Sequence, residues 1–262
     1  MDSYVVSLLF FPASVIASYM TLWFGISIIV KRNDIADIAW GPGFIIVALC
    51  LIISSQTYHP RLLLASLLTF LWGMRLAIHI FIRNKNKKED FRYLAWRKEW
   101  GAWFYIRTYL QVFLLQGVFM LLISMSAITL SLYPGNSISV LDVVGVCVWI
   151  VGFLFETIGD LQLSRFIANS RNKKKIMTEG LWQYTRHPNY FGEVTVWWGI
   201  FLIASSSPLW FIALLSPLTI SFLILKVSGI PLLEKKYEGN KEFELYKKRT
   251  NAFFPWFPKK NI

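Results

Sequence analysis

The sequence has 262 residues, a net charge of +12 and a hydrophobic fraction of 55%, including 12 Trp and 21 Phe. Its apolar residues fall in long uncharged runs, which excludes an ordinary soluble domain. The basic residues lie in short segments between these runs and not on one face of a soluble module, so we do not expect nucleic-acid binding. Attraction to anionic membrane lipids accounts for them instead.

Seven apolar segments are each close to the roughly 20 residues that a helix needs to cross a bilayer. In chain order they are Ser3–Val30, Ile35–Ser54, Leu62–Ile82, Ile106–Leu132, Val140–Gly159, Tyr190–Ser205 and Pro208–Leu225. The sixth is short and could form a tight hairpin with the seventh. The sequence therefore predicts an all-α, polytopic membrane protein with seven transmembrane helices, built as a single domain over residues 1–262.

The positions of the basic residues predict the orientation of these helices. Apart from Arg61 and Arg75, every Lys and Arg lies in one of four segments, at 31–32, 83–107, 165–186 and 226–260. With seven helices, all four segments lie on the same side of the membrane. Because basic loops stay in the cytoplasm, we expect the N-terminus outside and the C-terminus inside. In a prokaryote this would be the bacterial inner membrane.

Several of the predicted helices carry ionisable residues. Asp37 lies near the start of the second, and Arg75 and His79 share one face of the third. Such residues are costly in lipid and usually functional, although a long side chain such as that of Arg75 could simply reach the interface.

Two carboxylates, Glu156 and Asp160, lie four residues apart on the fifth predicted helix and therefore share a face. Adjacent acids repel each other unless cations or hydrogen-bond donors satisfy them. One interpretation is a pair of salt bridges to Arg165 or to Lys173–Lys175. The other is that both accept hydrogen bonds from a cofactor whose phosphates contact the basic residues.

The segment Gly180–Glu193, GLWQYTRHPNYFGE, places a polar cluster directly before an apolar run. Pro188 favours a helix that starts at this position, because its ring fits the first helical turn. The N-terminus of that helix would present free amide hydrogens to an anion. An interfacial anchor is the simpler alternative, but five hydrogen-bonding side chains favour a binding site: Arg186, His187, Asn189, Tyr190 and Glu193.

The residues Asn189, Gly192, Glu193, Trp197 and Gly199 match in register a motif of the steroid 5-alpha-reductase family, which this chain resembles. An uncharacterised bacterial branch of that superfamily is more similar still. That similarity extends to three further segments and to the spacing from Tyr246 to Pro255: DIAWG at 37–41, EDFRY at 89–93 and SGIPLLEKKY at 228–237.

The resemblance implies a reductase that binds NADPH in its cytoplasmic half, about residues 150–262, and transfers a hydride to a carbon–carbon double bond conjugated to a carbonyl. The substrate would be a lipid-like small molecule, a steroid-like or isoprenoid enone. Asp37 falls at the family's carbonyl-polarising acid, and Arg75 matches an arginine of the third helix; these are the expected catalytic residues. The expected cofactor-binding residues are Glu156, Asp160, Lys175, Arg186, His187, Asn189, Tyr190 and Glu193. No metal is expected.

Departures from the family pattern leave two other functions open. Trp72 stands where the family has a tyrosine that partners the catalytic acid, which is compatible with a lipid-binding membrane protein without catalytic activity. Isoprenylcysteine carboxyl methyltransferases share the Arg, His, Pro, Tyr and Gly of the segment 186–192, and they bind S-adenosylmethionine. Those enzymes carry two adjacent acids after the last helix, where this chain has Leu233 and Glu234.

Overall fold

The protein is helical throughout the part of the chain that its structure, a computed structural model, describes. The described residues are 3–55, 59–85, 89, 91–133, 135, 137–172 and 175–259. They divide into two compact units, residues 1–139 with 204–216 and residues 140–203 with 217–262.

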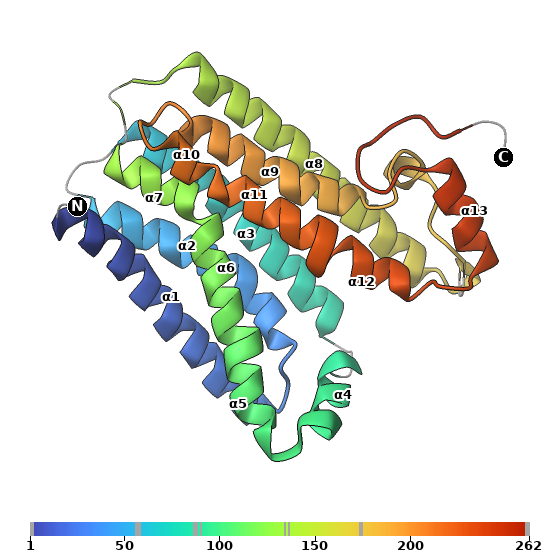
Figure 1. The fold of residues 1–262 in the computed structure, drawn as a ribbon. Coiled ribbons are helices and arrows are strands. Elements are labelled where there is room, and N and C mark those ends of the chain that lie inside the picture. Colours follow the sequence, from blue (N-terminus) through green and yellow to red (C-terminus); the bar gives the residue numbers. More distant parts are fainter. Residues whose placement is uncertain are drawn as a thin grey trace. The chain divides into compact units, whose positions relative to one another are not determined.

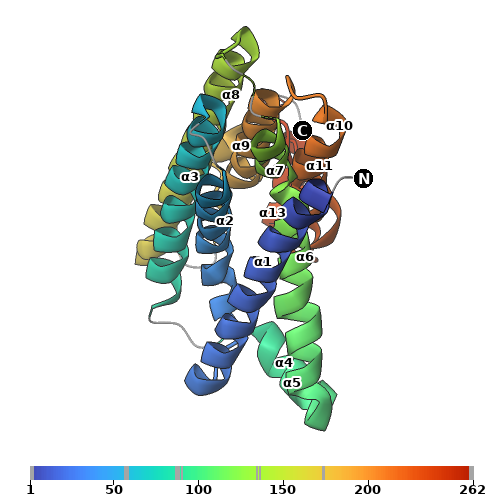
Figure 2. The same cartoon turned by 90° about the vertical axis from the view of Figure 1, so that its left-hand side faces the viewer.

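The first unit is built on three long helices that pack side by side (Figures 1 and 2). They are followed by a chain of short helical segments, which pack on α1 and α2. The elements are α1 (Ser3–Val30), α2 (Ile35–Ser54), α3 (Pro60–Asn84), α4 (Phe91–Trp100), η1 (Gly101–Trp103), α5 (Phe104–Thr108), η2 (Tyr109–Leu114), α6 (Leu115–Ile123), α7 (Met125–Leu132) and α10 (Trp210–Ala213).

The contact between α2 and α3 is close because glycine faces glycine. A Cβ atom on Gly73 would lie 2.8 Å from the carbonyl oxygen of Gly41. Beside this contact, Trp72 is fully buried and packs edge-on against Phe44, with the ring centroids 5.6 Å apart. Trp72 therefore serves as a core residue between the two helices.

The fourth predicted helix, Ile106–Leu132, is irregular in the structure. It contains a π-helical stretch, η2, and a turn at Ser124 that separates α6 from α7. π-Helical turns are rare and often occur at functional sites. Here the turn places Tyr109 against α1, where its hydroxyl lies 2.9 Å from that of Thr21.

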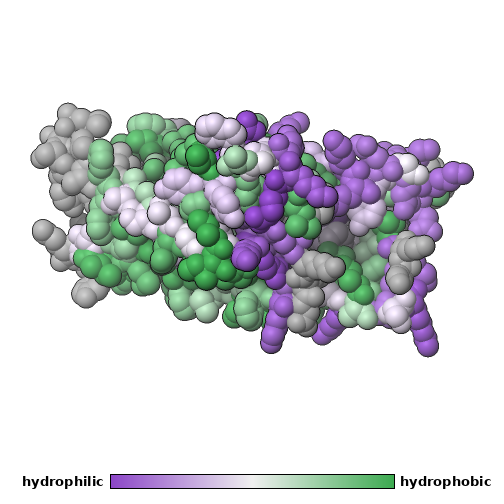
Figure 3. All heavy atoms as spheres, turned by 90° about the horizontal axis from the view of Figure 1, so that it is seen from below, coloured by the Kyte–Doolittle hydropathy of each residue, from purple (hydrophilic) through white to green (hydrophobic). Residues whose placement is uncertain are grey.

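The second unit contains the C-terminal helices and the polar segments between them. Its elements are α8 (Val140–Ala168), η3 (Ser170–Asn172), η4 (Gly180–Gln183), α9 (Pro188–Ala204), α11 (Leu215–Phe222), η5 (Leu223–Val227), α12 (Ile230–Lys235) and α13 (Lys241–Arg249). Hydrophilic side chains gather on the side where α13 lies in the view of Figure 3.

A seam of glycines joins α8 to α9, which lie side by side in Figure 1. Gly145, Gly152 and Gly159 recur every seven residues along α8 and therefore lie on one face. A Cβ atom on Gly152 would lie 2.7 Å from the carbonyl oxygen of Gly192, and one on Gly199 would lie 2.7 Å from that of Gly145. The two backbones are thus in direct contact.

Six helical segments of the described chain are long and apolar enough to cross a membrane. They are Phe10–Val30, Ile35–Ser54, Pro60–Asn84, Tyr93–Ile123, Val140–Ala168 and Trp210–Lys235. The sixth helix predicted from the sequence corresponds to α9, whose 17 residues span about 26 Å. By the length and composition of its helices, the chain is a multi-pass integral membrane protein.

Candidate functional site

The polar cluster predicted from the sequence lies where the chain enters α9. Pro188 is the first residue of this helix, as predicted, and His187 precedes it. The His187 amide donates to the Thr185 hydroxyl oxygen at 3.3 Å, and the His187 carbonyl accepts from the Phe191 amide at 3.0 Å. The Thr185 side chain therefore fixes the chain at the entry to α9.

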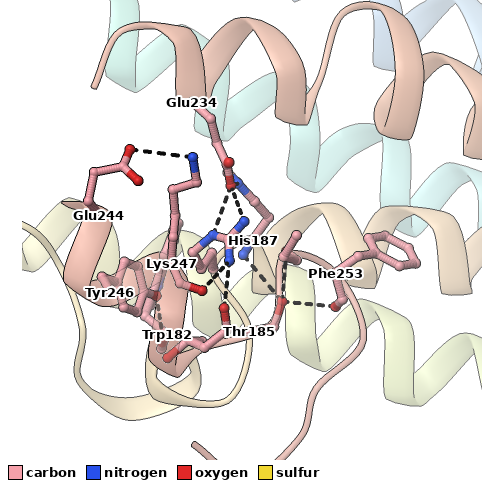
Figure 4. A network of polar contacts seen from close by, with 11 residues as sticks. Trp182, Thr185, His187, Glu234, Glu244, Tyr246, Lys247 and Phe253 are labelled. Atoms are coloured by element: carbon pink, nitrogen blue, oxygen red, sulfur yellow. Dashed lines mark hydrogen bonds and ion pairs between the residues drawn. The ribbon is translucent and has the colours of Figure 1, made fainter. Parts of the chain in front are cut away.

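Glu234 of α12 binds the side chains of Arg186 and His187 (Figure 4). Its Oε1 accepts from Arg186 Nε at 2.9 Å and from Arg186 Nη2 at 2.8 Å, and it lies 3.0 Å from His187 Nε2. All three side chains are largely buried, with 9%, 7% and 16% of Arg186, His187 and Glu234 exposed. Such burial of charge is tolerated because each charge has a partner of opposite sign.

The remaining donors of Arg186 hold the end of α13. Nη1 donates to the Thr250 carbonyl at 2.6 Å and to the Lys247 carbonyl at 3.4 Å. These are carbonyls of the last turn, which lack partners within the helix, and a cation is favourable there. Arg186 therefore links α12, α13 and the entry to α9.

Tyr246 adds a second link between α13 and the polar segment. Its hydroxyl donates to the Trp182 carbonyl, and burial raises the pKa of Tyr246 above its usual range. Trp182 in turn donates from its indole nitrogen to the Gly159 carbonyl of α8 at 3.1 Å. The roles of Thr185 and Tyr246 are not predictable from the sequence, because their partners are backbone groups.

The imidazole of His187 also packs against Tyr190. The two rings are stacked, with centroids 5.6 Å apart and planes inclined by 19°. Because Nε2 faces a carboxylate, it carries the proton of this hydrogen bond. The stacking and the hydrogen bond together fix the orientation of the ring.

Asn189 and Asp160 form a second polar pair, between α9 and α8. Asn189 Nδ2 donates to Asp160 Oδ1 at 3.1 Å, and Asp160 is 8% exposed. The other amide atom, Asn189 Oδ1, is buried and accepts no hydrogen bond within the described part of the protein. A buried carbonyl oxygen of this kind is a ready acceptor for a ligand N–H or O–H group.

Glu156 and Glu193 lie along the same seam of α8 and α9. Glu156 is 2% exposed and Glu193 is half-buried, and between them Gly192 contacts the α8 backbone at Glu156. Arg165 is exposed. Lys173 and Lys174 lie outside the described residues, and Lys175 is exposed.

The two expected catalytic residues belong to the first unit, where both are half-buried. Asp37 is in the first turn of α2 and shares a face with Gly41, one turn later. Arg75 follows Trp72, which packs between α2 and α3, by three residues, so it lies about 60° from Trp72 around α3.

A comparison with known families gives one match. The model of a family described as "Protein of unknown function (DUF1295)" matches residues 23–250. No curated protein and no solved structure matches the chain. The matched range contains all the residues discussed above from Asp37 to Thr250, and it covers most of the sequence. The chain therefore belongs to this DUF1295 family.

Proposed function

We propose that this protein is a membrane-embedded, NADPH-dependent reductase that transfers a hydride to a conjugated carbon–carbon double bond of a lipid enone. The observation that carries the proposal is the pair Asn189 and Asp160 at the start of α9. The side-chain oxygen of Asn189 is buried and accepts no hydrogen bond in the described part of the chain, and the carboxylate of Asp160 lies next to it. Amide and hydroxyl groups, which NADPH carries, are the donors that such a pair binds.

The surrounding residues suit a nucleotide in three further ways. Tyr190 offers an aromatic face that His187 already holds in place. The N-terminus of α9 favours an anion. Lys175, whose side chain is exposed, precedes this helix by 13 residues in the sequence. Glu156 and Glu193 supply further acceptors along α8 and α9.

NADPH would supply the hydride, and the protein's residues would bind and orient both reactants. In this proposal Asp37 holds a proton at its carboxyl group and donates a hydrogen bond to the substrate carbonyl, which stabilises the negative charge that forms there. Arg75 supplies a fixed positive charge. Arg186 and Glu234 hold the C-terminal segment in place around the entry to α9.

The proposal also includes the number of transmembrane helices and the side of the membrane on which each terminus lies. Counting α9 as a crossing gives seven transmembrane helices. The alternation of basic segments then supports an outer N-terminus and a cytoplasmic C-terminus. In a bacterium the protein would lie in the inner membrane, with NADPH reaching the site from the cytoplasm.

The proposal is tested by ligand-dependent thermal stability of the purified protein in detergent. A ligand that binds only the folded state at 100 times its Kd stabilises it by about 2.7 kcal/mol. We expect stabilisation by NADPH and none by S-adenosylmethionine. Asn189→Ala should weaken NADPH binding about tenfold, since a hydrogen bond to a buried group contributes about 1–2 kcal/mol. Gln183→Ala, an exposed side chain in the same segment, is the control and should bind normally.

A methyltransferase that uses S-adenosylmethionine is the second candidate. The observation in its favour is that Glu234 binds Arg186 and His187, because the related methyltransferases place acids at this point of the chain. Stabilisation by S-adenosylmethionine alone would establish this function in place of the reductase. If neither ligand stabilises the protein, both proposals fail, and a lipid-binding protein without catalysis becomes the better explanation.

A further inference from the structure

The C-terminal loop, Arg249–Lys259, is closed and firmly held. The Lys259 amide donates to the Arg249 carbonyl at 3.0 Å, which joins the two ends of the loop. Between them, the Trp256 amide donates to the Tyr184 carbonyl at 2.9 Å. These two bonds join the ends of the loop and attach its middle to the segment before α9.

Further bonds come from the segment before α9. The Thr185 hydroxyl donates to the Phe253 carbonyl at 2.8 Å, and the Arg186 amide donates to the Asn251 carbonyl at 2.9 Å. Figure 4 shows Thr185 and Phe253 joined in this way. The loop is thus attached to the residues that lead directly into α9.

Three large aromatic side chains of this loop point outward. Phe254, Trp256 and Phe257 are 70%, 69% and 77% exposed, whereas Phe253 is buried. An ordered loop that holds three apolar side chains in water exposes a patch that soluble proteins usually avoid. Their exposure in a rigid loop indicates that another apolar medium covers them.

The position of the loop identifies that medium. Phe191, in the first turn of α9, has its ring 5.7 Å from that of Phe253 and 6.4 Å from that of Phe254. The first turn of α9 is where the polar segment ends and the apolar helix begins. The exposed rings therefore lie at the depth of a membrane interface, where Trp in particular is enriched.

The charge of the C-terminal segment indicates which kind of lipid it contacts. From Leu245 to the C-terminus the sequence contains no Asp or Glu, but it contains five basic residues. They are Lys247, Lys248, Arg249, Lys259 and Lys260. Basic residues beside an apolar insertion are attracted to anionic headgroups, each by about 1 kcal/mol near the surface.

We propose that the C-terminal loop is a membrane-docking surface: Phe254, Trp256 and Phe257 insert into the interface of an anionic bilayer, and the flanking basic residues bind its headgroups. Docking adds a membrane contact outside the transmembrane helices. Because the loop is bonded to Tyr184, Thr185 and Arg186, this contact also fixes the entry to α9. The inference does not depend on the reductase proposal.

The test measures the depth of the loop directly. Cys50→Ala and Cys147→Ala remove the two native thiols, and Phe257→Cys then carries an environment-sensitive fluorophore. The matched control is Glu242→Cys, an exposed position in the first turn of α13. The full-length protein is reconstituted in phosphatidylcholine vesicles, with and without phosphatidylglycerol. Brominated lipid then reports contact with the bilayer, and aqueous iodide reports contact with water.

We expect brominated lipid to quench the fluorophore at position 257 several-fold more than at position 242, and iodide to show the reverse. Phosphatidylglycerol should increase the quenching by lipid at position 257. Equal iodide quenching at the two positions would overturn the proposal. Protection of position 257 from both quenchers would also overturn it, because the loop would then be covered by protein. Insensitivity to phosphatidylglycerol would overturn the role of the basic residues.

Discussion

Replacement of Glu234 by Gln tests whether the cluster of Arg186, His187 and Glu234 organises the C-terminal half of the protein. One carboxylate oxygen serves three donor atoms on two residues, at 2.8–3.0 Å. Glutamine keeps the size of the side chain and one carbonyl oxygen but removes the negative charge. The variant therefore isolates the charge from the packing.

The expected loss follows from the burial of the partners. Removing one member of a buried ion pair costs about 3–5 kcal/mol when the other charge is left uncompensated. Arg186 keeps its bond to the Thr250 carbonyl, and Glu234 is 16% exposed, so part of this cost is avoided. We expect Glu234→Gln to lose about 2 kcal/mol, which lowers the Tm of a chain of this size by about 4–8 °C.

The measurement is thermal unfolding in detergent, followed by tryptophan fluorescence, together with limited trypsin digestion. Glu238→Gln is the control, because it removes the same charge from an exposed position four residues further on. It should change the stability by less than about 0.5 kcal/mol. Glu234→Gln should also speed cleavage at the basic end of α13, since Arg186 no longer holds that end as firmly. Equal Tm values and cleavage rates for the two variants would refute our account of the cluster.

Two other predictions concern the seam and the C-terminal segment. Gly192→Ala should destabilise the protein by about 1–3 kcal/mol, because its Cβ would lie 2.7 Å from that of Glu156. The control Gly25→Ala faces open space within α1 and should not lower the Tm, because alanine favours a helix more than glycine does. A normal Tm for Gly192→Ala would contradict the backbone contact. Burial raises the pKa of Tyr246, so its contribution to stability is complete below the unfolded value of about 10 and is lost as the pH rises above it. Between roughly pH 8 and pH 11, thermal unfolding should therefore show a smaller loss of stability for Tyr246→Phe than for the wild type. If the stability of both proteins falls equally with pH, Tyr246 does not make this contribution.

Hydropathy predicted some helices to the residue and misjudged others. The predicted ranges 3–30 and 35–54 coincide with α1 and α2, because charged residues separate the two apolar runs and polar residues follow the second. The fifth helix continues to Ala168, nine residues beyond its predicted end, since no Gly or Pro follows Gly159 to stop it. The turn at Ser124 was not predictable from hydropathy, which does not register the pattern of backbone hydrogen bonds.

The candidate site was predictable where its residues are close in sequence. The start of α9 at Pro188 followed from the preference of proline for the first helical turn. The pairing of Asn189 with Asp160 joins two residues that lie 29 positions apart in the sequence, and no local pattern specifies it. The contact of Glu234 with Arg186 spans 48 residues. Its one signal in the sequence was the resemblance to methyltransferases that carry acids at this position.

The glycine seam also limits how α8 and α9 can move. A shift of one residue along the seam would place a side chain where only a hydrogen atom fits between the backbones. The next register that brings glycine opposite the same backbone groups is seven residues away, or about 10 Å of axial travel. Sliding between these helices is therefore blocked, and the pair moves as one rigid body.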